Sequence, residues 1–196
     1  MIKEYFSMPL SEEMIEINND ELRQLALDKY REEDGVVKSN LSGWQSDFVN
    51  NLDKPYQQLI MAILKSSGQI TEYYSVHQDL NRVLQNMWIN INPKGGSNRL
   101  HNHPGAFVSG VYYVNAPEDC GYLALEHPAS NYDYHCNRMN ISDWNIQNAA
   151  TLKIKPQTGK LVLFPSFAHH YVEPNNSNEL RISISFNIGF DKKVLA

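Results

Sequence analysis

The spacing of hydrophobic residues changes near residue 86 of this 196-residue chain. Before that point, apolar residues recur every three or four positions, which is typical of amphipathic helices. The pattern predicts a helix within 11–35, a second within 54–68 and a third over 71–87. Pro55 near the start of the second helix and Gly68 just beyond its end match the usual preferences at helix termini. We therefore expect residues 1–85 to form a mostly helical N-terminal support region.

After residue 86, short segments rich in β-branched and aromatic residues end at Pro, Gly, Asn or Asp, as strands do. These segments cover 87–92, 106–117, 121–128, 150–156, 159–167 and 180–190. In the last segment the alternation is strict. One face carries Ile182, Ile184, Phe186 and Ile188, and the other carries Arg181, Ser183, Ser185 and Asn187. Strands at this spacing indicate a sandwich or jelly roll.

Length and charge narrow the class of protein. The chain has the length of one domain, 1–196, with a mainly β core over 86–190 and N-terminal helices (an α+β chain). The formal net charge of −5 argues against binding nucleic acid by general phosphate attraction. No segment approaches the roughly 20 apolar residues of a membrane span, and the N-terminus does not resemble a signal peptide. We expect a soluble, cytoplasmic protein without a membrane partner.

Four histidines flank the predicted strands in a pattern that indicates a metal site. His101 and His103 are two residues apart, so they share one face of a strand. His169 and His170 follow the strand-like segment 159–167. Histidine is the commonest side-chain metal ligand. A close pair on one strand and a distant third ligand near another is a typical way to hold non-haem iron with open coordination positions.

Arg181 lies on the same face of its strand as Ser183. If that face points into a barrel, the guanidinium group needs an anionic partner. A dicarboxylate ligand suits it, because arginine binds carboxylates in a bidentate manner.

The chain contains four motifs in succession: HNHP at 101–104, SGVYYV at 109–114, FPSFAHHYVEPN at 164–175 and RISISFN at 181–187. Together they resemble the iron(II)- and 2-oxoglutarate-dependent oxygenases, most closely a small branch of the prolyl-hydroxylase-like superfamily. The resemblance covers about residues 86–190. It implies a double-stranded β-helix, the jelly roll of the cupins, as the catalytic core.

The resemblance also implies roles for individual residues. His101 and His170 match the iron ligands, while His169 stands where relatives vary. Arg181 and Ser183 match the pair that binds the far carboxylate of 2-oxoglutarate. One phenol, from Tyr112 or preferably Tyr113, would bind that same carboxylate, and Asn90 or Asn92 would hold the other end of the cosubstrate.

The third iron ligand departs from the wider superfamily, which uses HxD or HxE. Position 103 is histidine here, so a site of three neutral imidazoles would carry one negative charge fewer than a site of two histidines and one carboxylate. Glu126 is the alternative third ligand. Because a histidine fills the position that halogenating relatives leave empty, we do not expect halogenation.

The implied reaction couples O2 and the decarboxylation of 2-oxoglutarate to the oxidation of a substrate, such as a prolyl or other protein side chain or a small metabolite. Two other functions fit the histidines: a three-histidine cupin dioxygenase without 2-oxoglutarate, and a non-enzymatic jelly-roll binding protein. Arg181 separates the first of these from the oxygenase, because a cupin dioxygenase needs no anion anchor there.

Overall fold

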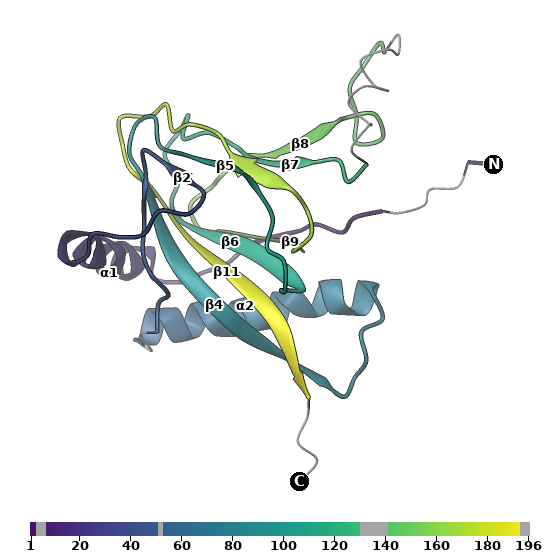
Figure 1. The fold of residues 1–196 in the computed structure, drawn as a ribbon, viewed down its shortest axis with the longest axis horizontal. Coiled ribbons are helices and arrows are strands. Elements are labelled where there is room, and N and C mark those ends of the chain that lie inside the picture. The colour runs from purple at the N-terminus through teal and green to yellow at the C-terminus, as the bar shows by residue number, and fades with distance from the viewer. Residues whose placement is uncertain (3–6, 51–52, 130–140, 193–196) are drawn as a thin grey trace.

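Two antiparallel sheets face each other, and two helices lie outside one of them (Figure 1). The computed structural model describes all residues except 3–6, 51–52, 130–140 and 193–196. The six-stranded sheet has the order β1 (Ser11–Met14), β9 (Lys160–Pro165), β6 (Val108–Asn115), β11 (Arg181–Lys192), β4 (Leu80–Asn92) and β3 (Trp44–Gln45). The five-stranded sheet has the order β2 (Asn40–Leu41), β5 (Ser97–His101), β10 (His170–Val172), β7 (Leu123–Glu126) and β8 (Thr151–Ile154). This jelly roll confirms the predicted fold class.

The helices cover the outer face of the six-stranded sheet. Helix α1 (Asn19–Glu32) buries Leu22 and Ala26, and helix α2 (Lys54–Tyr73) buries a longer apolar stripe. They pack on the apolar face of β11, where Ile182, Ile184, Phe186 and Ile188 are fully buried, as the alternation predicts. The opposite face of the sheet points to the five-stranded sheet, where a second apolar cluster includes Val111, Leu125 and Phe164.

The N-terminal region contains more strand than predicted. Ser11–Met14 forms β1, which pairs with β9, so the first helix is confined to Asn19–Glu32. The prediction of a third helix over 71–87 is wrong. Helix α2 continues past Gly68 to Tyr73, and Leu80 already begins β4, which pairs with β11 along its length. Long-range pairing overrides the weak helical periodicity of this segment.

The predicted division at residue 85 falls inside β4, and β1 and β3 join the same sheet as the later strands. The division of the chain into a support region, 1–85, and a catalytic core, 86–190, therefore stays a prediction.

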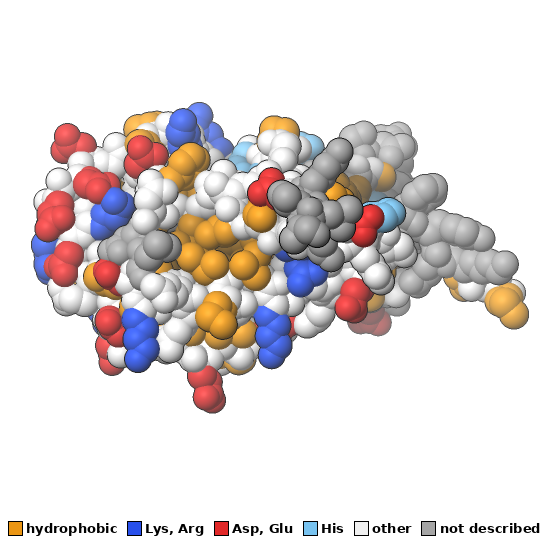
Figure 2. All heavy atoms as spheres, turned by 90° about the horizontal axis from the view of Figure 1, so that it is seen from below, with side chains coloured by type: hydrophobic (Ala, Val, Ile, Leu, Met, Phe, Trp, Pro, Cys, Tyr) orange, Lys and Arg blue, Asp and Glu red, His pale blue; other side chains and the backbone are white. Residues whose placement is uncertain are grey.

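One face of the molecule carries exposed hydrophobic side chains (Figure 2). Seen from below, hydrophobic side chains gather near the middle of one face, with Lys and Arg side chains at its margin (Figure 2). Met61 of α2 is one exposed hydrophobic residue. Neither helix of the described chain combines the length and apolar character needed to cross a bilayer.

Candidate active site

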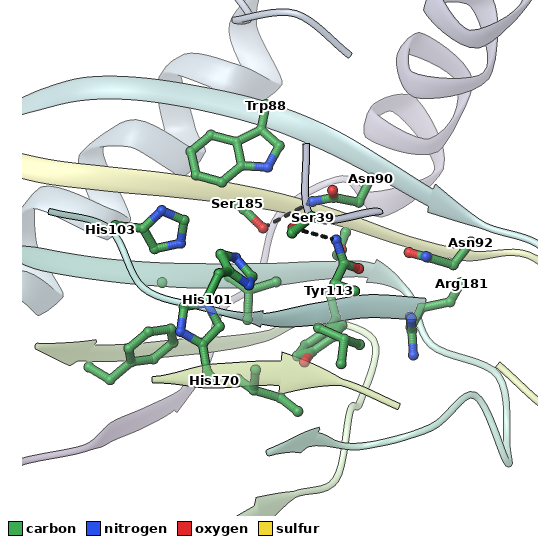
Figure 3. A pocket seen from close by; sticks show the side chains of 17 residues that line it. Ser39, Trp88, Asn90, Asn92, His101, His103, Tyr113, His170, Arg181 and Ser185 are labelled. Carbon is green, nitrogen blue, oxygen red and sulfur yellow. Dashed lines mark hydrogen bonds between the residues drawn. The ribbon is translucent and has the colours of Figure 1, made fainter. Parts of the chain in front are cut away.

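A pocket opens between the two sheets and receives side chains from both (Figure 3). The six-stranded sheet contributes every second residue of β4 and β11 on its inner face. The lining is formed by Ser39, Trp88, Asn90, Asn92, Asn98, His101, His103, Gly110, Val111, Tyr113, Leu123, Phe164, His170, Val172, Arg181, Ser183 and Ser185. Polar groups therefore converge on a site with apolar walls, the usual character of a small-ligand pocket.

Three histidines meet at one end of this pocket. His101 ends β5 and pairs across the sheet with His170, the first residue of β10, while His103 follows β5 by two residues. One ring nitrogen from each lies within 4.8 Å of those of the other two. That spacing suits ligands on three positions around one metal ion. Figure 3 shows the three rings close together.

Backbone carbonyl groups orient two of the rings. Nδ1 of His101 lies 2.7 Å from the carbonyl oxygen of Arg99, and Nδ1 of His170 lies 2.9 Å from that of Ala168. In a neutral imidazole, donation from Nδ1 leaves the lone pair on Nε2. Such second partners fix the ring and tautomer of metal-binding histidines.

Burial keeps the histidines uncharged. It lowers the pKa of His170 to about 3, aided by nearby His101, although the bond to Ala168 opposes the shift. Burial also lowers the pKa of His103 to about 4, again aided by His101. The neutral ring is the form that binds metals.

The third member of the group is His103 and not Glu126. Glu126 ends β7, is half-buried and does not line the pocket; its backbone N–H donates to the carbonyl oxygen of His169. Within the described residues, the potential metal ligands that cluster here include no carboxylate. His169 is exposed, next to the group but outside it.

Arg181 lies toward the other end of the pocket (Figure 3) and is 1% exposed. Its guanidinium donates to the carbonyl oxygens of Cys120, of Glu173 at 3.1 Å and of Gly96 at 3.4 Å. In the described part of the chain it has no carboxylate partner. Burial lowers its pKa, and nearby Tyr113 opposes the shift. A buried cation without a counter-ion is costly, and an anionic ligand would offset that cost.

The two tyrosines of β6 point to opposite sides of the sheet. Tyr113 lines the pocket and pairs across the strands with Ser183. Tyr112 lies in the helix-facing core, where its hydroxyl donates to Oδ1 of Asn19 at 2.8 Å. Of the two predicted candidates, Tyr113 is therefore the one that a ligand in this pocket can reach.

Asn90 and Asn92 both face the pocket from β4. Nδ2 of Asn90 donates to the hydroxyl of Ser185 at 3.0 Å, and its Oδ1 is buried with no hydrogen-bond partner. Buried polar atoms are rarely left unpaired. An unpaired oxygen in the pocket wall therefore indicates a place for a ligand.

The sequence did not single out some lining residues. Ser185 and Trp88 lie two positions from predicted site residues, so the strand period could have identified them. Ser39 and Asn98 had no such signal. They meet because β2 pairs with β5, and Nδ2 of Asn98 donates to the hydroxyl of Ser39 at 3.1 Å.

The fold resembles those of solved prolyl hydroxylases. A prolyl-4-hydroxylase from Pseudomonas putida is 18% identical, with a TM-score of 0.62 over 95% of this chain and 94% of that one. A viral collagen prolyl hydroxylase from Paramecium bursaria Chlorella virus-1, in complex with 2-oxoglutarate, is 14% identical, with a TM-score of 0.58 over 91% and 94%. A Trichoplax adhaerens prolyl hydroxylase, in complex with a hypoxia inducible factor peptide fragment, is 15% identical, with a TM-score of 0.58 over 94% and 84%.

No curated protein matches the sequence significantly. The model of one protein family, described as "Putative 2OG-Fe(II) oxygenase", matches residues 86–187, which is more than half of the chain. Enzymes of this family use iron(II), 2-oxoglutarate and O2, and the three-histidine group is suited to iron. The chain therefore belongs to the 2OG-Fe(II) oxygenase family.

Proposed function

We propose that the protein hydroxylates an aliphatic carbon of a protein side chain, such as a prolyl residue, or of a small metabolite. One observation carries the proposal: a single pocket holds three converging histidines and, toward its other end, a buried arginine without a carboxylate partner. The prolyl hydroxylases of similar fold support a side-chain substrate.

In this proposal, His101, His103 and His170 hold iron(II). The residues fit the metal because they are neutral, and two of them have Nδ1 engaged with backbone carbonyl oxygens, which leaves Nε2 free. Bound iron and 2-oxoglutarate would together reduce O2 and supply the oxidising power for hydroxylation.

The remaining pocket residues bind and orient 2-oxoglutarate. Arg181 donates charge-assisted hydrogen bonds to its distal carboxylate, helped by the hydroxyl groups of Ser183 and Tyr113. Asn90 and Asn92 hold the other end. If the Asn90 amide rotates by half a turn, Oδ1 accepts from the Ser185 hydroxyl and Nδ2 points into the pocket as a donor. The apolar side chains of Val111, Leu123 and Phe164 exclude water.

A second function has one specific observation in its favour. The absence of a carboxylate from the ligand group of the described residues also suits a three-histidine dioxygenase that uses no 2-oxoglutarate. Such an enzyme would leave the charge of Arg181 uncompensated, so 2-oxoglutarate binding separates the two functions.

Anaerobic titration with iron(II) and 2-oxoglutarate tests the proposal through the visible absorption of the iron–keto-acid chelate. We expect the band in the wild type and in His169→Ala, the exposed neighbour, and its loss in His170→Ala. Arg181→Ala should need about 10- to 100-fold more 2-oxoglutarate, because hydrogen bonds to charged groups contribute about 1.5–3 kcal/mol.

Iron binding without a chelate band would favour the three-histidine dioxygenase. A protein that binds no iron would be a non-enzymatic member of the fold.

A further inference from the structure

A second groove of about 530 Å³ adjoins the histidine end of the pocket. The two spaces share Ser39, Trp88, His101 and His103. The groove therefore opens onto the histidine end of the pocket.

The charged side chains that line this groove are Lys38 and Arg99, and no acidic side chain of the described residues lines it. Both are exposed, and neither forms an ion pair with a described residue. They lie on adjacent chain segments, because the N–H group of Arg99 donates to the carbonyl oxygen of Ser39 at 2.8 Å. In a chain with a net charge of −5, this is a local cationic site.

The acidic residue nearest in sequence to the groove lining does not itself line the groove. This residue, Asp47, lies beside the lining residue Phe48 and is exposed; its carboxylate accepts the N–H of Phe48 at 2.8 Å. An anionic ligand would therefore meet two unpaired cations.

The walls of the groove are open and partly apolar. Phe48 is 53% exposed, and Leu100, which follows Arg99 in the chain, is 48% exposed. Pockets for small molecules usually enclose most of the ligand surface. Half-exposed apolar walls suit a peptide ligand that lies across the surface of the protein and inserts one of its side chains into the groove.

We propose that this groove binds an acidic peptide segment, with Lys38 and Arg99 pairing with its carboxylates and the target side chain inserted toward the histidines. This inference rests on the proposed function for the identity of the reacting end. The recognition itself depends on charge complementarity, which mainly sets specificity and the rate of association.

Binding of fluorescent peptides to the full-length chain tests the inference without turnover. Three pools of random peptides would differ only at fixed positions that carry Glu, Gln or Lys, with binding followed by fluorescence anisotropy at low salt. We expect the Glu pool to bind the wild type most tightly. The double variant Lys38→Glu, Arg99→Glu should bind it roughly tenfold more weakly or worse.

The matched control is Arg23→Glu, Lys65→Glu. It makes the same change in net charge at exposed positions on α1 and α2, away from the groove lining. It should bind the Glu pool like the wild type. Equal losses in both double variants would reveal only general charge attraction and overturn the inference, as would a preference of the wild type for the Gln or Lys pool.

Displacement of the peptides by equimolar N-acetylglutamate would also overturn it, in favour of a small carboxylate ligand. The iron–2-oxoglutarate band, measured in the same proteins, separates the two proposals. A band without a preference for acidic peptides refutes this inference alone. Such a preference without a band refutes the proposed function alone.

Discussion

At the scale of single residues, the three-histidine group raises a question of charge. A 2-His-1-carboxylate site contributes one negative charge to iron(II), whereas His101, His103 and His170 contribute none. The neutral rings still offer three nitrogen ligands, two of them oriented by backbone carbonyl groups. We therefore expect His103 to contribute to iron(II) affinity as a nitrogen ligand, although it adds no negative charge to the site.

Replacement of His103 tests this assignment. We expect His103→Ala to weaken iron(II) binding by more than about 100-fold, because even a lost supporting residue costs 10- to 100-fold in metal affinity. His103→Asp should restore binding, since a carboxylate is a common iron ligand. Glu126→Ala is the control and should bind iron like the wild type, because Glu126 lies outside the group. Isothermal titration under anaerobic conditions measures all three, and a large loss in Glu126→Ala would refute the assignment.

The adjacent tyrosines provide a second matched pair. Tyr113→Phe removes a pocket hydroxyl and should raise the dissociation constant of 2-oxoglutarate about fivefold, because one hydrogen bond contributes about 1 kcal/mol. Tyr112→Phe removes the bond to Asn19 instead. It should lower the free energy of unfolding by about 1 kcal/mol and leave 2-oxoglutarate binding unchanged. Chelate titration measures the first effect and urea unfolding the second. Weaker 2-oxoglutarate binding in Tyr112→Phe but not in Tyr113→Phe would contradict the placement of Tyr113 in the pocket.

At the scale of elements, sequence reasoning succeeded where a period was strict and failed where pairing was long-range. The alternation in β11 correctly placed Ile182 and Ile184 in the core and Arg181 on the opposite face. The family model confirms the resemblance carried by the four motifs. Residues 80–87 lack a strict alternation, and their strand exists because β11 pairs with them. No local signal places Ser39 at the pocket, since pairing of β2 with β5 brings it there.

Gly68 tests the corrected boundary of α2. It lies inside the helix, and the nearest atom to an added methyl group would be in the Arg82 guanidinium, at 3.6 Å. Gly68→Ala should therefore raise the free energy of unfolding by about 0.5–1 kcal/mol, through better helix propensity. The sequence pattern predicts instead that the helix ends just before Gly68. In that case Gly68 would be expected to adopt the left-handed conformation, in which alanine is strained, and Gly68→Ala would lower the free energy of unfolding. Urea unfolding distinguishes the two outcomes.

At the scale of the whole molecule, the pocket joins two sheets that otherwise meet through apolar packing. His101 and His170 belong to the five-stranded sheet, whereas Asn90 and Arg181 belong to the six-stranded sheet. A metal held by the histidines is therefore anchored to the five-stranded sheet through His101 and His170, and to the loop after β5 through His103. A cosubstrate that reaches from that metal to Arg181 connects both sheets.

Ligand binding should therefore stabilise the protein in two separable steps. Nickel(II), which also binds imidazole nitrogen, should raise the free energy of unfolding by about 2.7 kcal/mol at 100 times its dissociation constant. Further addition of 2-oxoglutarate should add a second increment and slow amide hydrogen exchange in both sheets. Arg181→Ala should keep the first increment and lose most of the second, whereas His170→Ala should lose both. Thermal unfolding measures the increments, and an undiminished second increment in Arg181→Ala would show that 2-oxoglutarate does not bridge the sheets through this residue.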